Sequence, residues 1–232
     1  MTGRELRQAR EKKGWTQEEA APRLGLSQSY LSMLEKDKRA VPKARLEQVL
    51  NVYDYVLSPL ELPLQGEESW GELGNQEVAE QLAGLGYPGF SYMRSKATWN
   101  PAELLVAALT KDELESRLTE ALPWLVLKFN AMEWSWVVLQ VKMHDSQNRL
   151  GFVLTLATTL AEHMGKSAVS QQLSNVAEGL MPSVLLRELT LCHEHMPQAE
   201  RRWLKEHSTP EAKQWNVLSD LSSEHLSHAV VN

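Results

Sequence analysis

The sequence is poor in cysteine and in long apolar runs. A single cysteine, Cys192, among 232 residues excludes an intrachain disulfide and favours a reducing compartment. Residues 1–25 carry charged side chains throughout and have no apolar stretch, so we expect no signal peptide. The longest apolar runs, such as 121–127, are far too short to cross a bilayer. We therefore expect a soluble, cytoplasmic protein that does not associate with a membrane.

Composition and charge suggest a globular chain with two unlike parts. Hydrophobic residues make up 43% and charged residues 23%, which excludes wholesale disorder, and the length fits one large or two small domains. Residues 1–60 hold 11 Lys or Arg and 8 Asp or Glu, whereas residues 61–232 hold 13 and 22. A net charge of +3 followed by −9 is compatible with a first part that meets a polyanion, although so small an excess can also arise by chance.

Capping signals divide the first part of the chain into short helices. Capping boxes at residues 2–5 and 16–19 and an N-cap at Ser27 predict three helix starts. Gly14 and Gly25 end the first two helices, because glycine tolerates the left-handed backbone found there. Only two residues separate the second helix from the Ser27 cap, which is the spacing of a helix-turn-helix.

The same region carries a multi-point signature within the run LRQAREKKGWTQEEAAPRLGLSQSYLSMLEKDKR. Its elements are Leu6, Ala9-Arg10, Gly14, Thr16-Gln17-Glu18-Glu19, Ala21, Leu24-Gly25, Ser27-Gln28, Leu31-Ser32 and Leu34-Glu35. With these residues the segment resembles the Cro/repressor-type (Xre) helix-turn-helix family, over about residues 1–60. The resemblance implies a five-helix domain whose third helix enters the DNA major groove. Apolar spacing predicts the fourth helix over 43–53, and Ser58-Pro59 opens a short fifth.

The resemblance and side-chain chemistry together assign two sets of DNA contacts. The residues expected to face base edges from the third helix are Gln28, Ser29, Ser32 and Met33. A glutamine can bond adenine bidentately, which is worth about 1–3 kcal/mol of discrimination, and a methionine can touch a thymine methyl. The residues expected to contact the DNA backbone are Gln17, Tyr30, Lys36, Lys38, Arg39 and Lys43, with a helix-propping role as the alternative for Tyr30.

Two further features of this region concern stability. Arg10 and Glu35 match positions that pair in the family and tie the first helix to the third, so we interpret them as structural. The second helix departs from the family pattern, because Ala20 reduces core volume and Pro22 lies past the first turn. A proline there removes a helical hydrogen bond and costs about 3 kcal/mol in an ideal helix. We expect this helix to be kinked or loosened.

The rest of the chain shows helical periods and no strand alternation, so we expect an all-α fold. Further helices are expected at 76–85, from Asn100-Pro101, along a stripe at 114–122 that Pro123 interrupts, and over 134–141, 150–164, 168–180, 183–195, 198–206 and 210–228. They can close as a bundle or stack as an α-solenoid. The expected domains are a helix-turn-helix at 1–62, a linker at 63–75 and a helical dimerisation and partner-binding domain at 76–232.

Sites for catalysis or metal binding are poorly supported. Cys192-His193-Glu194-His195, expected on a helix, lacks the spacing that puts two histidines on one face, and no second cysteine exists. We interpret these residues as surface histidines around a buried cysteine. No Gly-rich phosphate loop or Ser–Lys pair with nucleophile spacing is recognisable. We therefore expect no metal, no cofactor and no enzyme activity.

Tryptophan offers a separate signal, because this residue is enriched in binding hot spots. We expect most tryptophans in the core. The alternative of a recognition surface stays open for Trp70, Trp99, Trp124, Trp134, Trp136 and Trp203.

These features favour a sequence-specific regulator that binds a double-stranded DNA operator as a homodimer and represses a promoter, often its own. The acidic helical part favours an antitoxin that neutralises a cognate toxin, because a basic toxin would be drawn to it. The alternatives are a ligand-responsive repressor, a metal-dependent enzyme tethered to DNA, and an interaction scaffold with a repurposed helix-turn-helix.

Overall fold

The computed structural model describes residues 3–39, 42, 45, 49, 52–53 and 73–226. The chain divides into two compact units, Met1–Leu57 and Ser58–Asn232, called here the N-terminal unit and the C-terminal unit and described one at a time. Both are built mainly of helices in the described ranges, so the all-α prediction is confirmed. No helix within those ranges is long and apolar enough to span a membrane.

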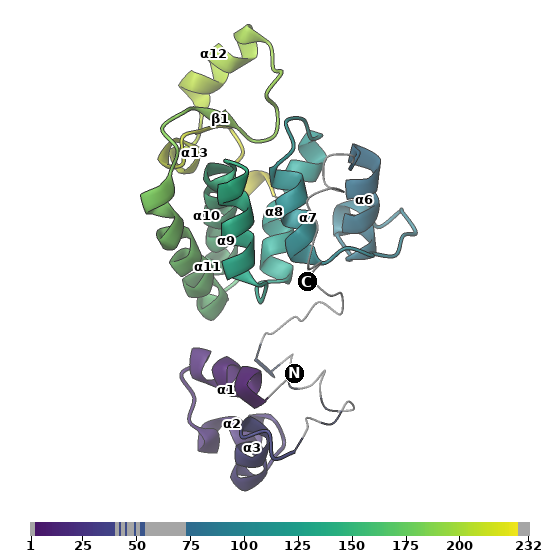
Figure 1. Cartoon of the computed structure of the whole chain (residues 1–232), viewed down its shortest axis with the longest axis vertical. Helices are drawn as coiled ribbons and strands as arrows, with labels where there is room; N and C mark the ends of the chain where they lie inside the picture. Colours follow the sequence, from purple (N-terminus) through teal and green to yellow (C-terminus); the bar gives the residue numbers. More distant parts are fainter. Residues whose placement is uncertain are drawn as a thin grey trace. The chain divides into compact units, whose positions relative to one another are not determined.

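The N-terminal unit contains α1 (Gly3–Lys12), α2 (Gln17–Arg23) and α3 (Gln28–Glu35) (Figure 1). Gly14 and Gly25 follow α1 and α2 with φ angles of 68° and 62°. Both helices therefore end just before these glycines, as the sequence predicted. The buried core residues of the unit are Leu6, Ala9, Ala20, Ala21, Leu24, Leu31, Leu34, Val49 and Tyr53. The capping box at 2–5, the fourth helix at 43–53 and the start of the fifth fall largely outside the described residues.

Pro22 does not break the second helix. It lies inside α2, one residue before the helix ends at Arg23, and its ring is exposed to solvent. Leu24 still donates its N–H to the carbonyl of Ala20 at 3.1 Å, so helical hydrogen bonding continues beyond the proline, and only the bond that residue 22 itself would donate is lost. The helix continues through the proline to Arg23, and the chain turns at Gly25 shortly afterwards. The expected kink or loosening stays a prediction.

The C-terminal unit is a bundle around α10 (Gln147–His163). Its other elements in the described range are α6 (Asn75–Gly84), α7 (Pro101–Leu109), α8 (Ser116–Lys128), α9 (Trp134–Met143), α11 (Ser167–Leu180), α12 (Gln198–His207), α13 (Pro210–Gln214), β1 (Leu189–Thr190), β2 (Val217–Leu218), and the 3-10 turns η1 (Pro88–Phe90), η2 (Met181–Ser183) and η3 (Ser223–His225). Helix α10 packs against α8, α9, α11 and α13, whereas in a solenoid each helix would contact only its neighbours. The bundle is therefore the correct alternative.

Burial explains why these helices stay together. All nine residues of α7 are buried, as are the first eight residues of α10, so both helices lie inside the unit. In Figure 1, helices α7 to α11 run side by side, and α12 lies with β1 beyond one end of them. Asn100 caps α7 as predicted, since its side chain accepts the N–H of Ala102 at 2.8 Å.

The prediction of a helix over 183–195 is wrong. Only Ser183 of this segment belongs to η2, and irregular chain leads from it to β1. Strand β1 pairs in parallel with β2 in the register Leu189 to Val217 and Thr190 to Leu218, and a turn follows. The physical reason is the buried Arg149 of α10, whose guanidinium donates to the carbonyl of Thr190 at 2.8 Å and to the Glu194 carboxylate at 2.7 Å. In a helix, the Thr190 carbonyl would accept a backbone N–H of the same helix instead.

The prediction of a helix over 210–228 is wrong from Trp215 to Leu226, and residues 227–228 lie outside the described ranges. Asn216 adopts a φ of 53°, after which the chain enters β2. Trp215 fixes this turn, because its side chain is buried and its indole N–H donates to Thr155 Oγ1 at 2.8 Å. The ring packs where Gly151 of α10 has no side chain: an added Cβ would lie 2.1 Å from the indole.

Pro123 also fails to interrupt its helix. Helix α8 runs through it for 13 residues, and residues 121–127 are all buried. The free energy gained by burying this apolar stretch outweighs the loss of the hydrogen bond that the proline removes. Tertiary packing therefore decides the structure here, against the low helix propensity of proline.

Candidate nucleic-acid interface

The turn between α2 and α3 is defined by hydrogen bonds at both helix starts. At α2, Thr16 Oγ1 accepts the N–H of Glu19 at 3.2 Å, and the Glu19 carboxylate accepts the N–H of Thr16 at 2.7 Å. At α3, Ser27 Oγ accepts the N–H of Tyr30 at 3.2 Å. Both predicted caps are therefore present. Between them the N–H of Leu26 bonds the carbonyl of Ala21 at 2.9 Å, which closes the chain around Gly25.

Helix α3 has one buried face and one face that solvent reaches. Leu31 and Leu34 are buried, and the Glu35 side chain is only 2% exposed. Gln28 and Ser29 are exposed, while Ser32 and Met33 are half-buried. All four predicted base-facing residues thus retain access to solvent, with Gln28 and Ser29 at the N-terminal end of the helix, where recognition helices contact base edges.

A chain of hydrogen bonds links Gln28 to a buried ion pair. Arg10 and Glu35 form a bidentate pair, with Nε to Oε1 at 2.7 Å and Nη2 to Oε2 at 3.1 Å. Gln17 Nε2 donates to Glu35 Oε2 at 2.8 Å, and Gln28 Nε2 donates to Gln17 Oε1 at 3.0 Å. The hydrogen bond to Glu35 raises the pKa of Arg10, so the guanidinium stays charged. The predicted pairing of Arg10 with Glu35 is confirmed.

This arrangement orients the amide that is expected to read a base. A glutamine amide has two N–H donors and one carbonyl oxygen. One donor of Gln28 is occupied by Gln17, which leaves the second donor and the oxygen for the N7 and N6 groups of an adenine. The contact between Gln17 and Gln28 did not emerge from the sequence analysis. Its only sequence signal is that each glutamine immediately follows an N-cap residue.

The predicted DNA-backbone contacts lie mainly after α3. Lys36, Lys38 and Arg39 are exposed, and the Arg39 guanidinium lies 5.8 Å from the centre of the Tyr30 ring. Tyr30 packs partly against the core, which favours the propping role considered for it. Lys43 lies outside the described residues.

Sequence analysis missed two arginines that stabilise this unit. Arg45 Nη1 donates to the carbonyl of Gly25 at 3.1 Å and so secures the turn between α2 and α3. Arg23 places its guanidinium 4.5 Å from the centre of the Trp15 ring, a cation–π contact at the end of α2. Neither position is marked by a capping or periodicity signal.

The cluster at 192–195 lies in a turn rather than on a helix. Cys192 is completely buried, and burial raises the pKa of its thiol to about 11, so it stays protonated at neutral pH. His193 and His195 each place Nδ1 2.9 Å from the Glu113 carboxylate. The backbone N–H of His195, together with these rings, lowers the pKa of Glu113 to about 2. The described residues contain no group of three ligands placed to hold a metal ion.

The tryptophans are distributed between core and surface. Trp124 and Trp215 are buried, Trp203 is 48% exposed, and Trp15, Trp99, Trp134 and Trp136 are half-buried. Trp70 lies outside the described residues. Trp203 is therefore the exposed tryptophan in the part of the chain that the structure describes.

Comparison with known proteins bears on the N-terminal unit. A family model described as helix-turn-helix matches residues 6–58. A search of curated proteins and a search of solved structures each found no match. The family match covers the capped α2–α3 pair, its Gly25 turn and the Arg10–Glu35 ion pair. Residues 6–58 are accordingly a helix-turn-helix domain of the Xre/Cro type.

Proposed function

We propose that the protein is a transcription regulator that recognises double-stranded DNA by sequence, with α3 in the major groove. The observation that carries the proposal is the exposed start of α3, where Gln28 is oriented through Gln17 by the buried Arg10–Glu35 pair. In this proposal Gln28, Ser29, Ser32 and Met33 face base edges, and the backbone is contacted by Gln17, Tyr30, Lys36, Lys38, Arg39 and Lys43.

Base readers and phosphate binders are expected to respond differently to substitution. Lys38→Ala should weaken binding to every duplex and reduce the slope of log K against log salt by about 0.9, because one phosphate contact is lost. Gln28→Ala should leave that slope unchanged and reduce only the preference among sequences. Fluorescence anisotropy of a labelled 30-base-pair duplex between about 50 and 200 mM NaCl measures both effects.

Lys142→Ala supplies the matched control for charge, since Lys142 is an exposed lysine of α9 outside the helix-turn-helix. It should change neither affinity nor slope. Equal slopes for Lys38→Ala and the wild type, or a reduced slope for Gln28→Ala, would contradict these roles.

Operators of helix-turn-helix dimers repeat their half-sites about one DNA turn, 34–36 Å, apart. We propose that the protein binds as a homodimer through its C-terminal unit and blocks a promoter, its own included. Analytical ultracentrifugation of the full chain with a duplex operator should give two chains per duplex. One chain per duplex at saturation would contradict the dimer.

The charge of the C-terminal part favours a second, more specific role. Residues 61–232 carry 22 acidic and 13 basic side chains, which steers a basic protein toward them. We propose on this ground that the protein acts as an antitoxin whose C-terminal unit neutralises a basic toxin. Mass spectrometry of the complex purified from its source tests this: a neighbouring-gene protein in fixed stoichiometry supports the antitoxin, and a bound small molecule supports the ligand-responsive alternative.

A further inference from the structure

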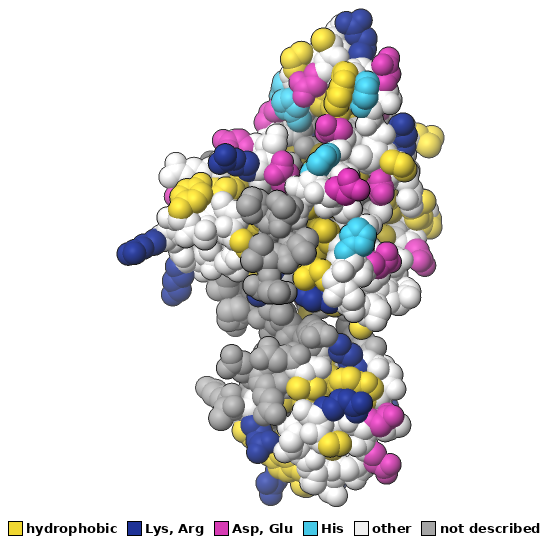
Figure 2. Space-filling model, turned by 180° about the vertical axis from the view of Figure 1, so that it is seen from behind, with side chains coloured by type: hydrophobic (Ala, Val, Ile, Leu, Met, Phe, Trp, Pro, Cys, Tyr) yellow, Lys and Arg dark blue, Asp and Glu magenta, His cyan; other side chains and the backbone are white. Residues whose placement is uncertain are grey.

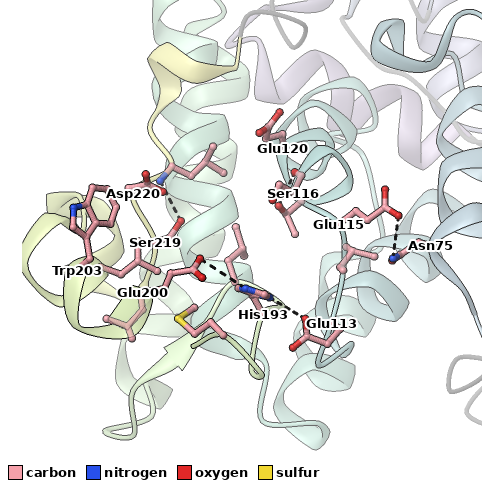
Figure 3. A pocket seen from close by; sticks show the side chains of 17 residues that line it. Asn75, Glu113, Glu115, Ser116, Glu120, His193, Glu200, Trp203, Ser219 and Asp220 are labelled. Atoms are coloured by element: carbon pink, nitrogen blue, oxygen red, sulfur yellow. Dashed lines mark hydrogen bonds and ion pairs between the residues drawn. The ribbon is translucent and has the colours of Figure 1, made fainter. Parts of the chain in front are cut away.

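A cavity of about 600 Å³ lies in the C-terminal unit where five segments meet. They are the start of α6, the loop entering α8 with the first turns of that helix, the turn after β1, helix α12, and the end of β2 with the chain that follows it. Figure 3 shows Glu113, Glu115 and Glu120 on one side of this space, Trp203 and Asp220 on the other, and His193 between them. The volume lies within the range of ligand-binding clefts and exceeds that of one side chain.

The walls of the cavity carry charge of one sign. Five carboxylates line it, namely Glu113, Glu115, Glu120, Glu200 and Asp220, and none of its described lining residues is a lysine or arginine. Around α12, the face drawn in Figure 2 shows acidic and histidine side chains together with lysine or arginine side chains, so the excess of one sign belongs to the lining of the cavity. Carboxylates that line one cavity together favour a cationic ligand there.

Internal partners compensate only some of these carboxylates. Glu113 bonds His193 and His195, Glu200 lies 3.8 Å from His193 Nε2, and Glu115 accepts a hydrogen bond from Asn75 at 3.4 Å. The carboxylates of Glu120 and Asp220 form no ion pair or hydrogen bond with another described residue. In Figure 3 these two acids lie on different sides of the cavity, whose described lining contains no lysine or arginine.

The floor of the cavity is apolar. It is formed by Leu114, Leu191, Met196, Leu204, Leu218 and Leu221, each with 7–9% of its surface still exposed. At the rim, Trp203 stacks one ring face on His207, with centroids 4.3 Å apart, which holds the indole in place while 48% of the residue stays exposed. The cavity thus offers carboxylates, an apolar surface and an immobilised aromatic ring together.

One side chain matches all three features. The guanidinium of arginine pairs with carboxylates in a planar fork and stacks on tryptophan, and its three methylenes cover apolar surface. We propose that this cavity is a docking site for an arginine-bearing segment of a partner protein, with the guanidinium between Glu120, Asp220 and Trp203. The inference rests on the partner-binding role proposed above for the C-terminal unit, and it is independent of DNA binding.

Isothermal titration calorimetry on the full chain at low ionic strength tests the site. The probes are the peptide Ac-Gly-Leu-Arg-Leu-Gly-NH2, the same peptide with neutral citrulline in place of arginine, and free agmatine. The arginine peptide should bind at least tenfold more tightly than the citrulline peptide and than agmatine. Equal binding of the two peptides, or no binding of the arginine peptide at millimolar concentration, would overturn the proposal; agmatine binding as tightly as the peptide would make this a site for a free cation instead.

Two double variants test whether the arginine peptide binds in this cavity. Glu120→Gln with Asp220→Asn removes the two unpaired acids and should weaken the arginine peptide at least tenfold. Glu206→Gln with Glu224→Gln removes two exposed acids that do not line the cavity and should leave the affinity within twofold. Equal losses in both would mean diffuse charge attraction and would refute a built site. Operator binding by the same proteins, measured in parallel, keeps a failure of this site distinct from a failure of the DNA-binding proposal.

Discussion

Replacing Glu35 by alanine is expected to remove much of the stability of the N-terminal unit and to weaken DNA binding. The Arg10 and Glu35 side chains are 11% and 2% exposed, and removing one partner of a buried pair costs about 3–5 kcal/mol because the other charge is left uncompensated. A unit spanning Met1–Leu57 has a total stability of only about 3–9 kcal/mol. Hydrogen exchange followed by mass spectrometry should show lost protection in α1–α3 and unchanged protection in α10.

The double variant Arg10→Met with Glu35→Leu, compared with Glu35→Ala, separates the role of the ion pair in folding from its role in orienting Gln28. Apolar replacement of both members of a buried pair is often neutral or stabilising, so protection in α1–α3 should return. Gln17, however, loses its acceptor, and Gln28 is no longer oriented through it. We therefore expect a folded domain with reduced sequence preference. Unchanged protection in Glu35→Ala would show that the pair does not support this unit.

Replacing Arg149 by leucine is expected to destabilise the C-terminal unit by about 3–5 kcal/mol. The guanidinium donates to the carbonyls of Leu109, Lys111 and Thr190, each at 2.8 Å, and to the Glu194 carboxylate at 2.7 Å. It thereby joins the end of α7, β1 and the turn at 191–195 to α10. Leucine would leave the three carbonyls without this donor, while Glu194 would keep its hydrogen bonds from Thr190. Each buried unsatisfied group costs about 1–3 kcal/mol.

Thermal unfolding followed by circular dichroism measures the loss. For a unit of this size a loss of 1 kcal/mol lowers Tm by about 2–4 °C, so Arg149→Leu should lower it by about 6–20 °C. Arg187→Leu is the control, because Arg187 lies 3.5 Å from Asp145 on the surface with 60% of its side chain exposed, and such pairs contribute less than about 1 kcal/mol. A Tm that falls equally in both variants would contradict the role given to Arg149.

Arg149 also explains how far the fold could be predicted from the sequence. Helix starts at Thr16, Ser27 and Asn100 were correct because a cap involves residues two or three positions apart. The segments at 183–195 and 215–226 were wrongly predicted because their conformation depends on partners 41 and 60 residues away, Arg149 for Thr190 and Thr155 for Trp215. Local propensity does not contain such contacts.

The candidate interface was likewise predictable where it depends on local sequence and not where it depends on distant contacts. The polar face of α3 follows from the 3.6-residue period that buries Leu31 and Leu34, so the sequence alone was enough to expect an accessible Gln28. The hydrogen bonds from Glu35 through Gln17 to Gln28 depend on how closely the starts of α2 and α3 approach in space. The cavity beside α12 was not foreseen for a related reason, since its carboxylates come from segments up to 107 positions apart, Glu113 and Asp220.

Selection from a random double-stranded DNA library tests the central claim most directly, because it requires no prior operator. The full chain should enrich a motif whose half-sites are centred about 10 base pairs apart, with adenine preferred at one position of each half-site. Gln28→Ala should enrich the same motif with the preference at that position reduced or lost. Failure of the wild-type chain to enrich any motif, or identical motifs from both proteins, would contradict sequence reading by the start of α3.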